Sequence, residues 1–169
     1  MTSGRHVVFW SGGQDSTLVA VQLLRANEHV ILVTFDNCWI GGEGQQNKEK
    51  MSRKRTLERF KTEFGQNRFE HKIYTWDGEL NTGIQNKAWV SLFPLALRDQ
   101  DKAYFGCIKT DEYWHVRHTF EEAFNAVCKH HEKKIELKYP LEWYDKGQVI
   151  KELKRTGYLD LSIHSGDKL

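Results

Sequence analysis

Seven residues near the start of the chain combine glycines, hydroxyls and a carboxylate in a pattern suited to holding an anion. They lie between the apolar run of residues 6–10 and the amphipathic segment of residues 17–26, which predicts a strand, a glycine turn and a helix. Backbone amides at such a turn and the positive end of the helix dipole converge on one point, and glycines let a phosphate approach closely. The acidic residue can cap the helix or hold a cation. The seven are Ser11, Gly12, Gly13, Gln14, Asp15, Ser16 and Thr17.

Two other phosphate-binding patterns are absent from the sequence. The chain has no Gly-x4-Gly-Lys-Ser/Thr string, so a lysine-type phosphate loop is not expected. It also has no Gly-x-Gly-x-x-Gly after a predicted strand, so dinucleotide binding has no support.

The composition fits one soluble domain. The chain has 169 residues and a net charge of +2, which is too balanced to indicate nucleic-acid binding by itself. The basic segment 48–61 is interpreted as the exposed face of a helix. No apolar run approaches the roughly 20 residues of a membrane span, and no secretory signal is seen, so a cytoplasmic location is expected. The cysteines Cys38, Cys107 and Cys128 are widely spaced, which favours neither a disulfide framework nor a structural zinc site.

Strands and helices are predicted to alternate along the chain. This order predicts an α/β fold with a doubly wound parallel sheet in a single domain, 1–169. Residues 36–46 are expected in a turn-rich segment and 77–85 in a polar loop, and 157–169 are expected as a mobile tail. The predicted strands are 6–10, 30–35, 69–76, 103–108 and 135–137, and the predicted helices are 17–26, 47–64, 86–98, 119–131 and 146–156.

Ligands of such sheets bind at the carboxyl ends of the strands, so loops 11–16, 36–46 and 109–117 are expected to converge. In the third loop, Asp111 is expected to hold magnesium with pyrophosphate, and Lys109 or Arg117 to neutralise developing charge. A metal site formed by Asp111, His115 and His118 is a less favoured alternative. The pair His130-His131 is explained by its place late in a helix, where the dipole favours it.

The string of residues 11–16 resembles the Ser-Gly-Gly-x-Asp-Ser loop of ATP pyrophosphatases, which cleave ATP between the α and β phosphates. Residues 106–120 look like the stretch of 7-cyano-7-deazaguanine synthase in which Gly-x4-Asp precedes Tyr-Pro-Asp-Cys-Arg-x-x-Phe. Tyr113, Arg117 and Phe120 match that stretch. Further similarities lie in Phe35-Asp36 followed by Gly44-Gln45, in Pro140-Leu141, and in the segment from Lys146 to Gly157.

The resemblance implies an adenine nucleotide alpha hydrolase-like fold and an ATP-dependent ligase. ATP would adenylate the carboxylate of 7-carboxy-7-deazaguanine, ammonia would form the amide, and a second activation would give the nitrile for modification of tRNA or DNA. Asp15 and Asp111 would share a magnesium ion, and Asp15, Lys109, Asp111 and Arg117 would be catalytic. ATP would be bound by the loop residues and Phe35, and the substrate by Asn86, Tyr113 and His115.

The resemblance also implies partners and cofactors. They are ATP, magnesium, a 7-deazaguanine acid and ammonia, in a homodimer that needs neither a membrane nor nucleic acid. Zinc is not expected, because the chain lacks the four-cysteine cluster with which that family ends. Trp89, Tyr113 and Trp114 either stack on a flat purine-like substrate or belong to the core.

Two alternatives stay open. One is another enzyme with the same loop, such as a tRNA-thiolation or a phosphoadenylylsulfate reductase-like enzyme. The other is a non-catalytic nucleotide-binding partner, against which the intact loop argues.

Overall fold

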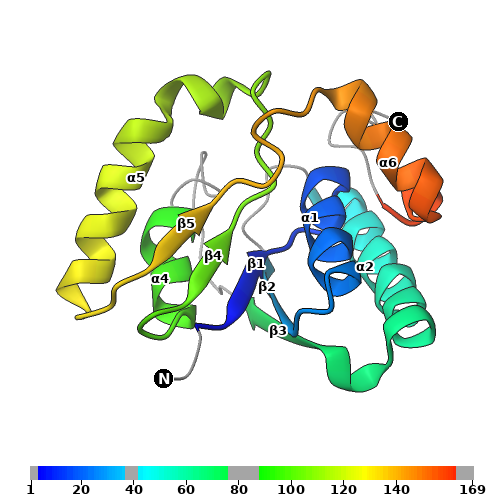
Figure 1. Cartoon of the computed structure of the whole chain (residues 1–169), viewed down its shortest axis with the longest axis horizontal. Coiled ribbons are helices and arrows are strands. Elements are labelled where there is room, and N and C mark those ends of the chain that lie inside the picture. The colour runs from blue at the N-terminus through cyan, green and yellow to red at the C-terminus, as the bar shows by residue number, and fades with distance from the viewer. Residues whose placement is uncertain (1–3, 37–41, 76–87, 163–169) are drawn as a thin grey trace.

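The protein is built on a parallel β-sheet, shown in Figure 1. The computed structural model describes residues 4–36, 42–75 and 88–162, and five strands lie within these ranges. They are β1 (His6–Phe9), β2 (Val30–Asp36), β3 (Phe69–Thr75), β4 (Lys102–Tyr104) and β5 (Glu136–Lys138). Neighbouring strands follow the order β3-β2-β1-β4-β5, and all pairs are parallel. The predicted α/β fold with a doubly wound parallel sheet is therefore confirmed.

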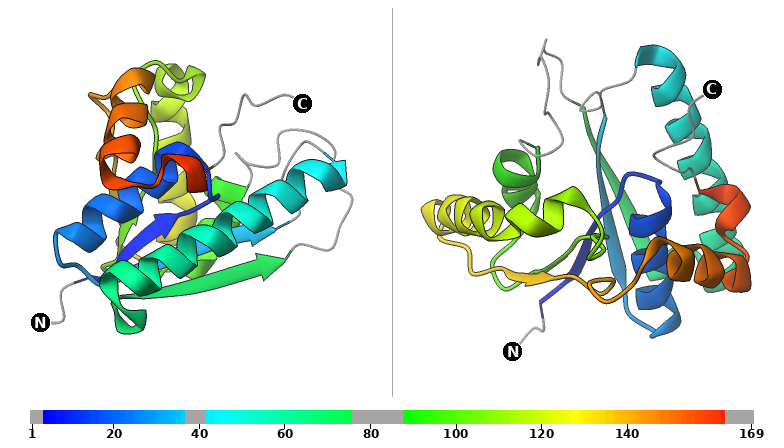
Figure 2. Two further views of the ribbon diagram at one scale, coloured as in Figure 1. Left: turned by 90° about the vertical axis from the view of Figure 1, so that its right-hand side faces the viewer. Right: turned by 90° about the horizontal axis from the view of Figure 1, so that it is seen from above.

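Helices cover both faces of the sheet, as Figure 2 shows. One face carries α1 (Gln14–Arg25), α2 (Gly42–Phe64) and α6 (Lys146–Thr156), and the other carries α4 (Phe93–Ala96) and α5 (Glu112–His130). Shorter turns are η1 (Gln66–Arg68), the π-helical turn η2 (Ala88–Leu92) and η3 (Leu159–Leu161). Because the chain leaves β1 and β4 toward opposite faces, the switch point of the sheet lies between these two strands.

Side chains of the central strand, β1, pack into a separate hydrophobic core on each face of the sheet. Val7 and Phe9 belong to the core beneath α4 and α5, whereas Val8 and the following Trp10 belong to the core beneath α1, α2 and α6. All four side chains are buried. A strand that is covered on both faces must be apolar at consecutive positions, which is why residues 6–10 read as one continuous apolar run.

The two helices that border the switch point begin earlier than the sequence pattern predicts. Helix α1 begins at Gln14 instead of residue 17, and α5 begins at Glu112 instead of residue 119. The preceding residues, Gly13 and Asp111, have extended backbone and act as N-caps. The first turn of each of these helices is polar. Apolar periodicity in the sequence therefore does not show where either helix begins. The prediction of a loop over residues 109–117 is therefore wrong from Glu112 onward.

Helix α2 also begins early, at Gly42, so residues 42–46 are helical and not part of a turn-rich segment. Glycines make this start a weak helix by propensity, but a long helix propagates at little cost once it has formed. Its predicted end is confirmed, because α2 ends at Phe64 and Gly65 follows with φ +90°. Residues 37–41, at the start of the predicted turn-rich segment, lie outside the described residues.

Two further predictions differ in extent, and a third falls outside the described residues. Strand β4 spans Lys102–Tyr104, so residues 105–108 of the predicted strand 103–108 are not in a strand. The predicted helix 86–98 is a π-helical turn followed by α4, and Pro94 lies in the first turn of α4, where the missing amide costs nothing. Residues 76–87, which include Trp76, the predicted polar loop 77–85 and Asn86, lie outside the described residues.

The last helix has the predicted bounds. Asp145 and Gln148 form a reciprocal capping box at the start of α6, and Gly157 closes the helix with φ +80°.

Part of the expected mobile tail packs onto the domain, because Tyr158 is fully buried and the carbonyl oxygen of Leu161 accepts a hydrogen bond from Ser52. Residues 163–169 lie outside the described residues. None of the helices in the described part of the chain is long and apolar enough to cross a membrane.

Beyond β4, the backbone passes directly against the first turn of α1. A Cβ atom at Gly106 would lie 2.6 Å from the amide nitrogen of Ser16 and 2.7 Å from the carbonyl carbon of Asp15. Both are backbone atoms, which cannot rotate away. Only glycine therefore allows this approach.

We predict that Gly106→Ala lowers the free energy of unfolding by on the order of 1–3 kcal/mol, because a buried methyl group must displace backbone. Urea denaturation measures the change. Gly147→Ala in α6 is the matched control, since a Cβ there would meet only the side chain of Asp145, at 3.2 Å. Equal free energies of unfolding for the two variants would show that the backbone around Gly106 can shift to accommodate a methyl group without loss of stability.

Candidate functional site

The candidate site is built on the turn that links β1 to α1. Gly12 has φ +89°, a conformation that side-chain-bearing residues rarely adopt. Gly13 caps α1 without a side chain, so the start of the helix has no internal carboxylate or hydroxyl cap at that position. The positive end of the helix dipole is thus available to an external anion.

Hydroxyl groups hold the turn in a closed shape. Ser11 Oγ accepts a hydrogen bond from the amide of Gly13 at 3.1 Å and lies 3.2 Å from Ser16 Oγ. The amide of Ser11 donates to Ser16 Oγ at 3.3 Å. Thr17 is different, because its hydroxyl is buried and accepts from Trp10 Nε1 at 3.0 Å. The side chain of Thr17 therefore holds the turn on the core, and its predicted role as an anion ligand is not supported.

Asp15 in the first turn of α1 forms an ion pair with Lys146. Lys146 Nζ lies 2.9 Å and 3.1 Å from the two carboxylate oxygens of Asp15, and both side chains are partly exposed. Sequence reasoning did not assign Lys146 to the site. One signal could have found it: a lysine in the first turn of a helix opposes the helix dipole, which indicates that its charge is used elsewhere.

Asp111 lies in the same electrostatic environment. Burial raises the pKa of its carboxyl group, and the charge of Asp15 raises it further. The amide of Ile108, which donates to Asp111 Oδ2 at 2.9 Å, and the charge of Lys146 lower that pKa. The charges of Asp15 and Lys146 both shift the pKa of Asp111. The three groups therefore form one cluster at the carboxyl ends of β1 and β4.

The cluster has a donor set that fits a hard divalent cation. The charge of Asp15 raises the pKa of Asp111, so a cation between the two carboxyl groups would favour ionised Asp111, and oxygen is the ligand that magnesium prefers. Within the described residues, no group of three or more His, Cys, Asp and Glu side chains could hold a metal ion. A cation held by Asp15 and Asp111 would thus need further oxygens, such as those of a phosphate. The alternative site of Asp111, His115 and His118 is not assembled in the described structure.

The other predicted catalytic residues are placed as follows. Lys109 is exposed in the turn before Asp111. The guanidinium of Arg117 stacks on the ring of Trp114 at 4.3 Å and donates to the carbonyl oxygen of the same residue at 2.9 Å. These contacts lie within α5 and do not link Arg117 to the turn, so its role at a phosphate stays a prediction.

The predicted ATP- and substrate-binding residues outside the turn fall into two groups. Phe35 is buried and stacks on Phe9, so its side chain belongs to the core and not to the surface of the site. Tyr113 is half-buried, packs edge-on against Trp89 and lies 3.3 Å from Tyr139, hydroxyl to hydroxyl. Burial raises the pKa of Tyr113. His115 is exposed on α5, and Asn86 lies outside the described residues.

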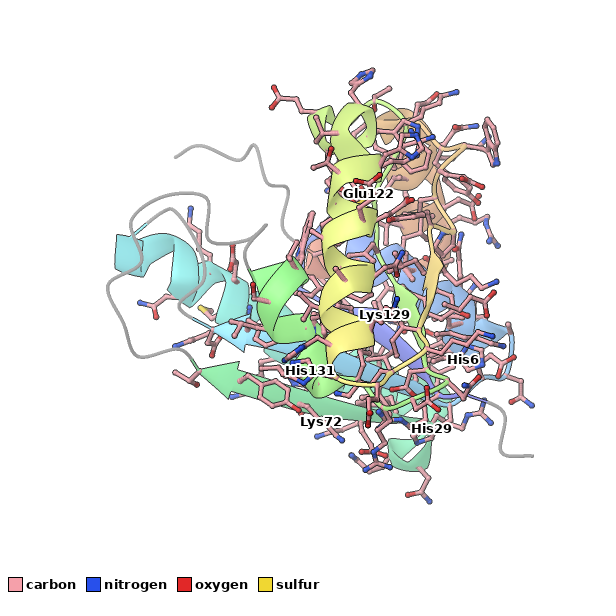
Figure 3. All side chains as sticks on the ribbon, turned by 90° about the vertical axis from the view of Figure 1, so that its left-hand side faces the viewer. His6, His29, Lys72, Glu122, Lys129 and His131 are labelled. Carbon is pink, nitrogen blue, oxygen red and sulfur yellow. The ribbon has the colours of Figure 1, made fainter. Side chains whose placement is uncertain are left out.

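The described residues at the opposite end of the sheet include none of these groups. Figure 3 places His6 and His29 at the amino ends of β1 and β2 and Lys72 along β3, with His131 at the nearby end of α5. A groove of about 740 Å³ lies there, lined in part by His29, Lys61, Phe69 and Lys72. Asp15 and Asp111, at the carboxyl ends, do not line it. The helix-end position of His130 and His131 agrees with their interpretation as residues favoured by the dipole.

A partly buried histidine, His71, lies behind the turn. The single proton of the Thr34 hydroxyl is donated to the carbonyl oxygen of Trp10 at 2.7 Å, so Thr34 Oγ1 accepts from His71 Nε2, 2.9 Å away. Burial, together with the charge of Arg53, lowers the pKa of His71 to about 4, although Asp36 opposes the shift. His71 is therefore neutral and carries its proton on Nε2.

We predict that His71 makes stability pH-dependent. Its folded-state pKa of about 4 lies below the ordinary value of 6.5, so the unfolded chain binds more protons between these values. The contribution is complete above about pH 6.5 and is lost as the pH falls toward about 4. Urea denaturation at about pH 7 and about pH 4.5 should show a smaller loss for His71→Gln than for wild type. An unchanged loss in the variant would contradict the assignment.

Comparisons with known proteins leave the family open: a scan against models of protein families finds no match, and a search of curated proteins finds none either.

We predict that Lys146→Gln raises the pKa of Asp111, because the ammonium group that lowers it is removed. Titration of the Asp111 carboxyl carbon by NMR measures the shift. Lys151→Gln, on the exposed part of α6, is the matched control and should leave the titration unchanged. An unchanged pKa in Lys146→Gln would show that Lys146 is too distant to belong to the cluster.

Proposed function

We propose that this chain is an ATP-dependent ligase of the ATP pyrophosphatase type, which transfers AMP to a carboxylate and releases pyrophosphate. One observation carries the proposal: the glycine turn between β1 and α1, at the switch point of a parallel sheet, is flanked by Asp15, Asp111 and Lys146. The crevice at a switch point is where nucleotides bind in such sheets.

The charges of the cluster are suited to holding a triphosphate. The turn itself contains no lysine, and the positive charge comes from Lys146 on α6. Backbone amides at the start of α1 and this ammonium group would stabilise pyrophosphate as its charge develops, which lowers the barrier to AMP transfer. Asp15 and Asp111 would hold magnesium, which would neutralise charge on the phosphate oxygens.

The proposed acceptor is 7-carboxy-7-deazaguanine, and the support for it is the sequence resemblance. A carboxylate oxygen attacks the α-phosphorus and pyrophosphate leaves. Ammonia then attacks the acyl carbon, AMP leaves with the former carboxylate oxygen, and the amide forms with loss of a proton. The amide oxygen then attacks the α-phosphorus of a second ATP and pyrophosphate leaves. AMP departs with that oxygen while the nitrogen loses both protons, which leaves the nitrile. We place this reaction in the cytoplasm, with the product used for deazaguanine modification of tRNA or DNA.

Thiol chemistry is less favoured at the described cysteines. Burial raises the pKa of Cys128 to about 11 and raises that of Cys107 even further, while the charges of Asp111 and Asp15 add to the effect at Cys107. A nucleophilic cysteine needs its thiolate form near neutral pH, which neither residue provides. This supports a ligase over a thiolation enzyme or a sulfonucleotide reductase that would use these cysteines.

We predict that ATP is split to AMP and pyrophosphate when 7-carboxy-7-deazaguanine, ammonium and magnesium are supplied. Phosphorus NMR identifies the products, and two ATP should be consumed per nitrile. Asp111→Asn should lower the rate by roughly 10²- to 10³-fold, as is typical when one preorganised electrostatic group is lost. Asp160→Asn, at an exposed carboxylate of η3, is the control and should leave the rate unchanged.

The possible outcomes separate the parts of the proposal. ADP and phosphate as the main products would contradict AMP transfer. AMP formation that depends on a different carboxylic acid would keep the reaction type and overturn the acceptor.

A further inference from the structure

Two consecutive carbonyl oxygens around the anion-binding turn are each held by a side chain from outside it. One donor comes from β2 and the other from α2, so the turn is fixed along two peptide groups. The pairs are Thr34 Oγ1 to Trp10 at 2.7 Å and Arg53 Nη1 to Ser11 at 3.1 Å.

A held carbonyl also orients the next amide. In a planar trans peptide, the C=O of one residue and the N–H of the next point in opposite directions. The bond from Arg53 to the carbonyl oxygen of Ser11 therefore turns the amide of Gly12 away from α2. A charged donor on the carbonyl also polarises the peptide group and strengthens its N–H as a donor.

Arg53 is itself rigidly held. Its side chain is only 4% exposed, and its Nη2 donates to Asp36 Oδ1 at 2.6 Å, at the end of β2. Glu49 Oε2 lies 3.9 Å from the other terminal nitrogen. A planar guanidinium can serve a carboxylate and a carbonyl with different nitrogens at once, whereas a lysine ammonium is a single point charge.

The stem of Arg53 also fits against the turn. A Cβ atom at Gly12 would lie 2.5 Å from Arg53 Cγ and 3.5 Å from Cδ. The side chain thus occupies the space that a larger residue at Gly12 would need, and the turn and Arg53 are packed as one unit.

We infer that Arg53 is a positioning residue for phosphate binding, which orients and polarises the Gly12 amide toward the terminal phosphates of a nucleoside triphosphate without touching them. The inference rests on the proposed function, because it takes the turn to be the pyrophosphate site. Asp36 contributes indirectly, because its carboxylate keeps the guanidinium of Arg53 in place.

Binding of pyrophosphate, ATP and AMP to the full chain tests the inference, with isothermal titration calorimetry as the measurement. Arg53→Lys keeps the charge beside Asp36 and removes the fork, so affinity for pyrophosphate and ATP should fall at least about tenfold. AMP lacks the terminal phosphates and should bind as it does to wild type. A residue that merely supports the fold would weaken all three.

Two further variants complete the test. Removal of Arg53 alone would leave Asp36, whose side chain is only 14% exposed, without its partner, so the double variant Arg53→Gln with Asp36→Asn removes both charges. It should show the same selective loss while thermal denaturation reports a folded protein. Arg55→Gln, at an exposed arginine of the same helix, is the matched control and should bind all three ligands normally.

If wild type binds neither pyrophosphate nor ATP, the proposed function fails and the inference with it. If wild type binds both and a folded Arg53 variant binds them equally well, the inference alone fails. An equal loss for AMP and pyrophosphate would also overturn it.

Discussion

The close approach of the backbone at Gly106 to the first turn of α1 is the constraint on which the site depends. Strand β4 pairs with β1 along only three residues, and the chain then passes within contact distance of Asp15 and Ser16. Glycine is required because any side chain would meet backbone atoms. The approach brings the start of α5, and Asp111 with it, into the electrostatic field of Asp15.

A second constraint is the balance of charge around that approach. Asp15 and Asp111 repel each other, and Lys146 offsets the repulsion from a helix on the opposite side of α1 from α5. The arrangement keeps both carboxylates at the carboxyl ends of β1 and β4, and no third acidic group among the described residues completes a metal-binding set with them. On the α2 side, Arg53 and Asp36 form a separate, more deeply buried pair that contacts the backbone of the turn. Charge thus surrounds the turn from three elements that are distant in sequence.

Much of the fold could be predicted from the sequence, and the missed boundaries share a cause. The apolar run of residues 30–35 identified β2, because a strand buried on both faces leaves a local pattern, and the predicted bounds of α6 also agree with the structure. The starts of α1 and α5 were missed, since Gln14 and Glu112 open polar first turns. The length of β4 was overestimated, because residues 105–108 are as apolar as a strand but pack in the cores without extending the sheet.

The sequence by itself determined the turn, the fold class and the place of Asp15 and Asp111 at strand ends, since glycine spacing and strand order are local or topological properties. Only the tertiary structure decided which charges meet. Lys146 lies 131 residues from Asp15, and Arg53 lies 42 residues from the carbonyl that it holds. No local pattern encodes such pairs, because they depend on how α6 and α2 pack on α1 and the sheet. Packing likewise assigned Phe35 and Thr17 to the core, where their side chains are buried.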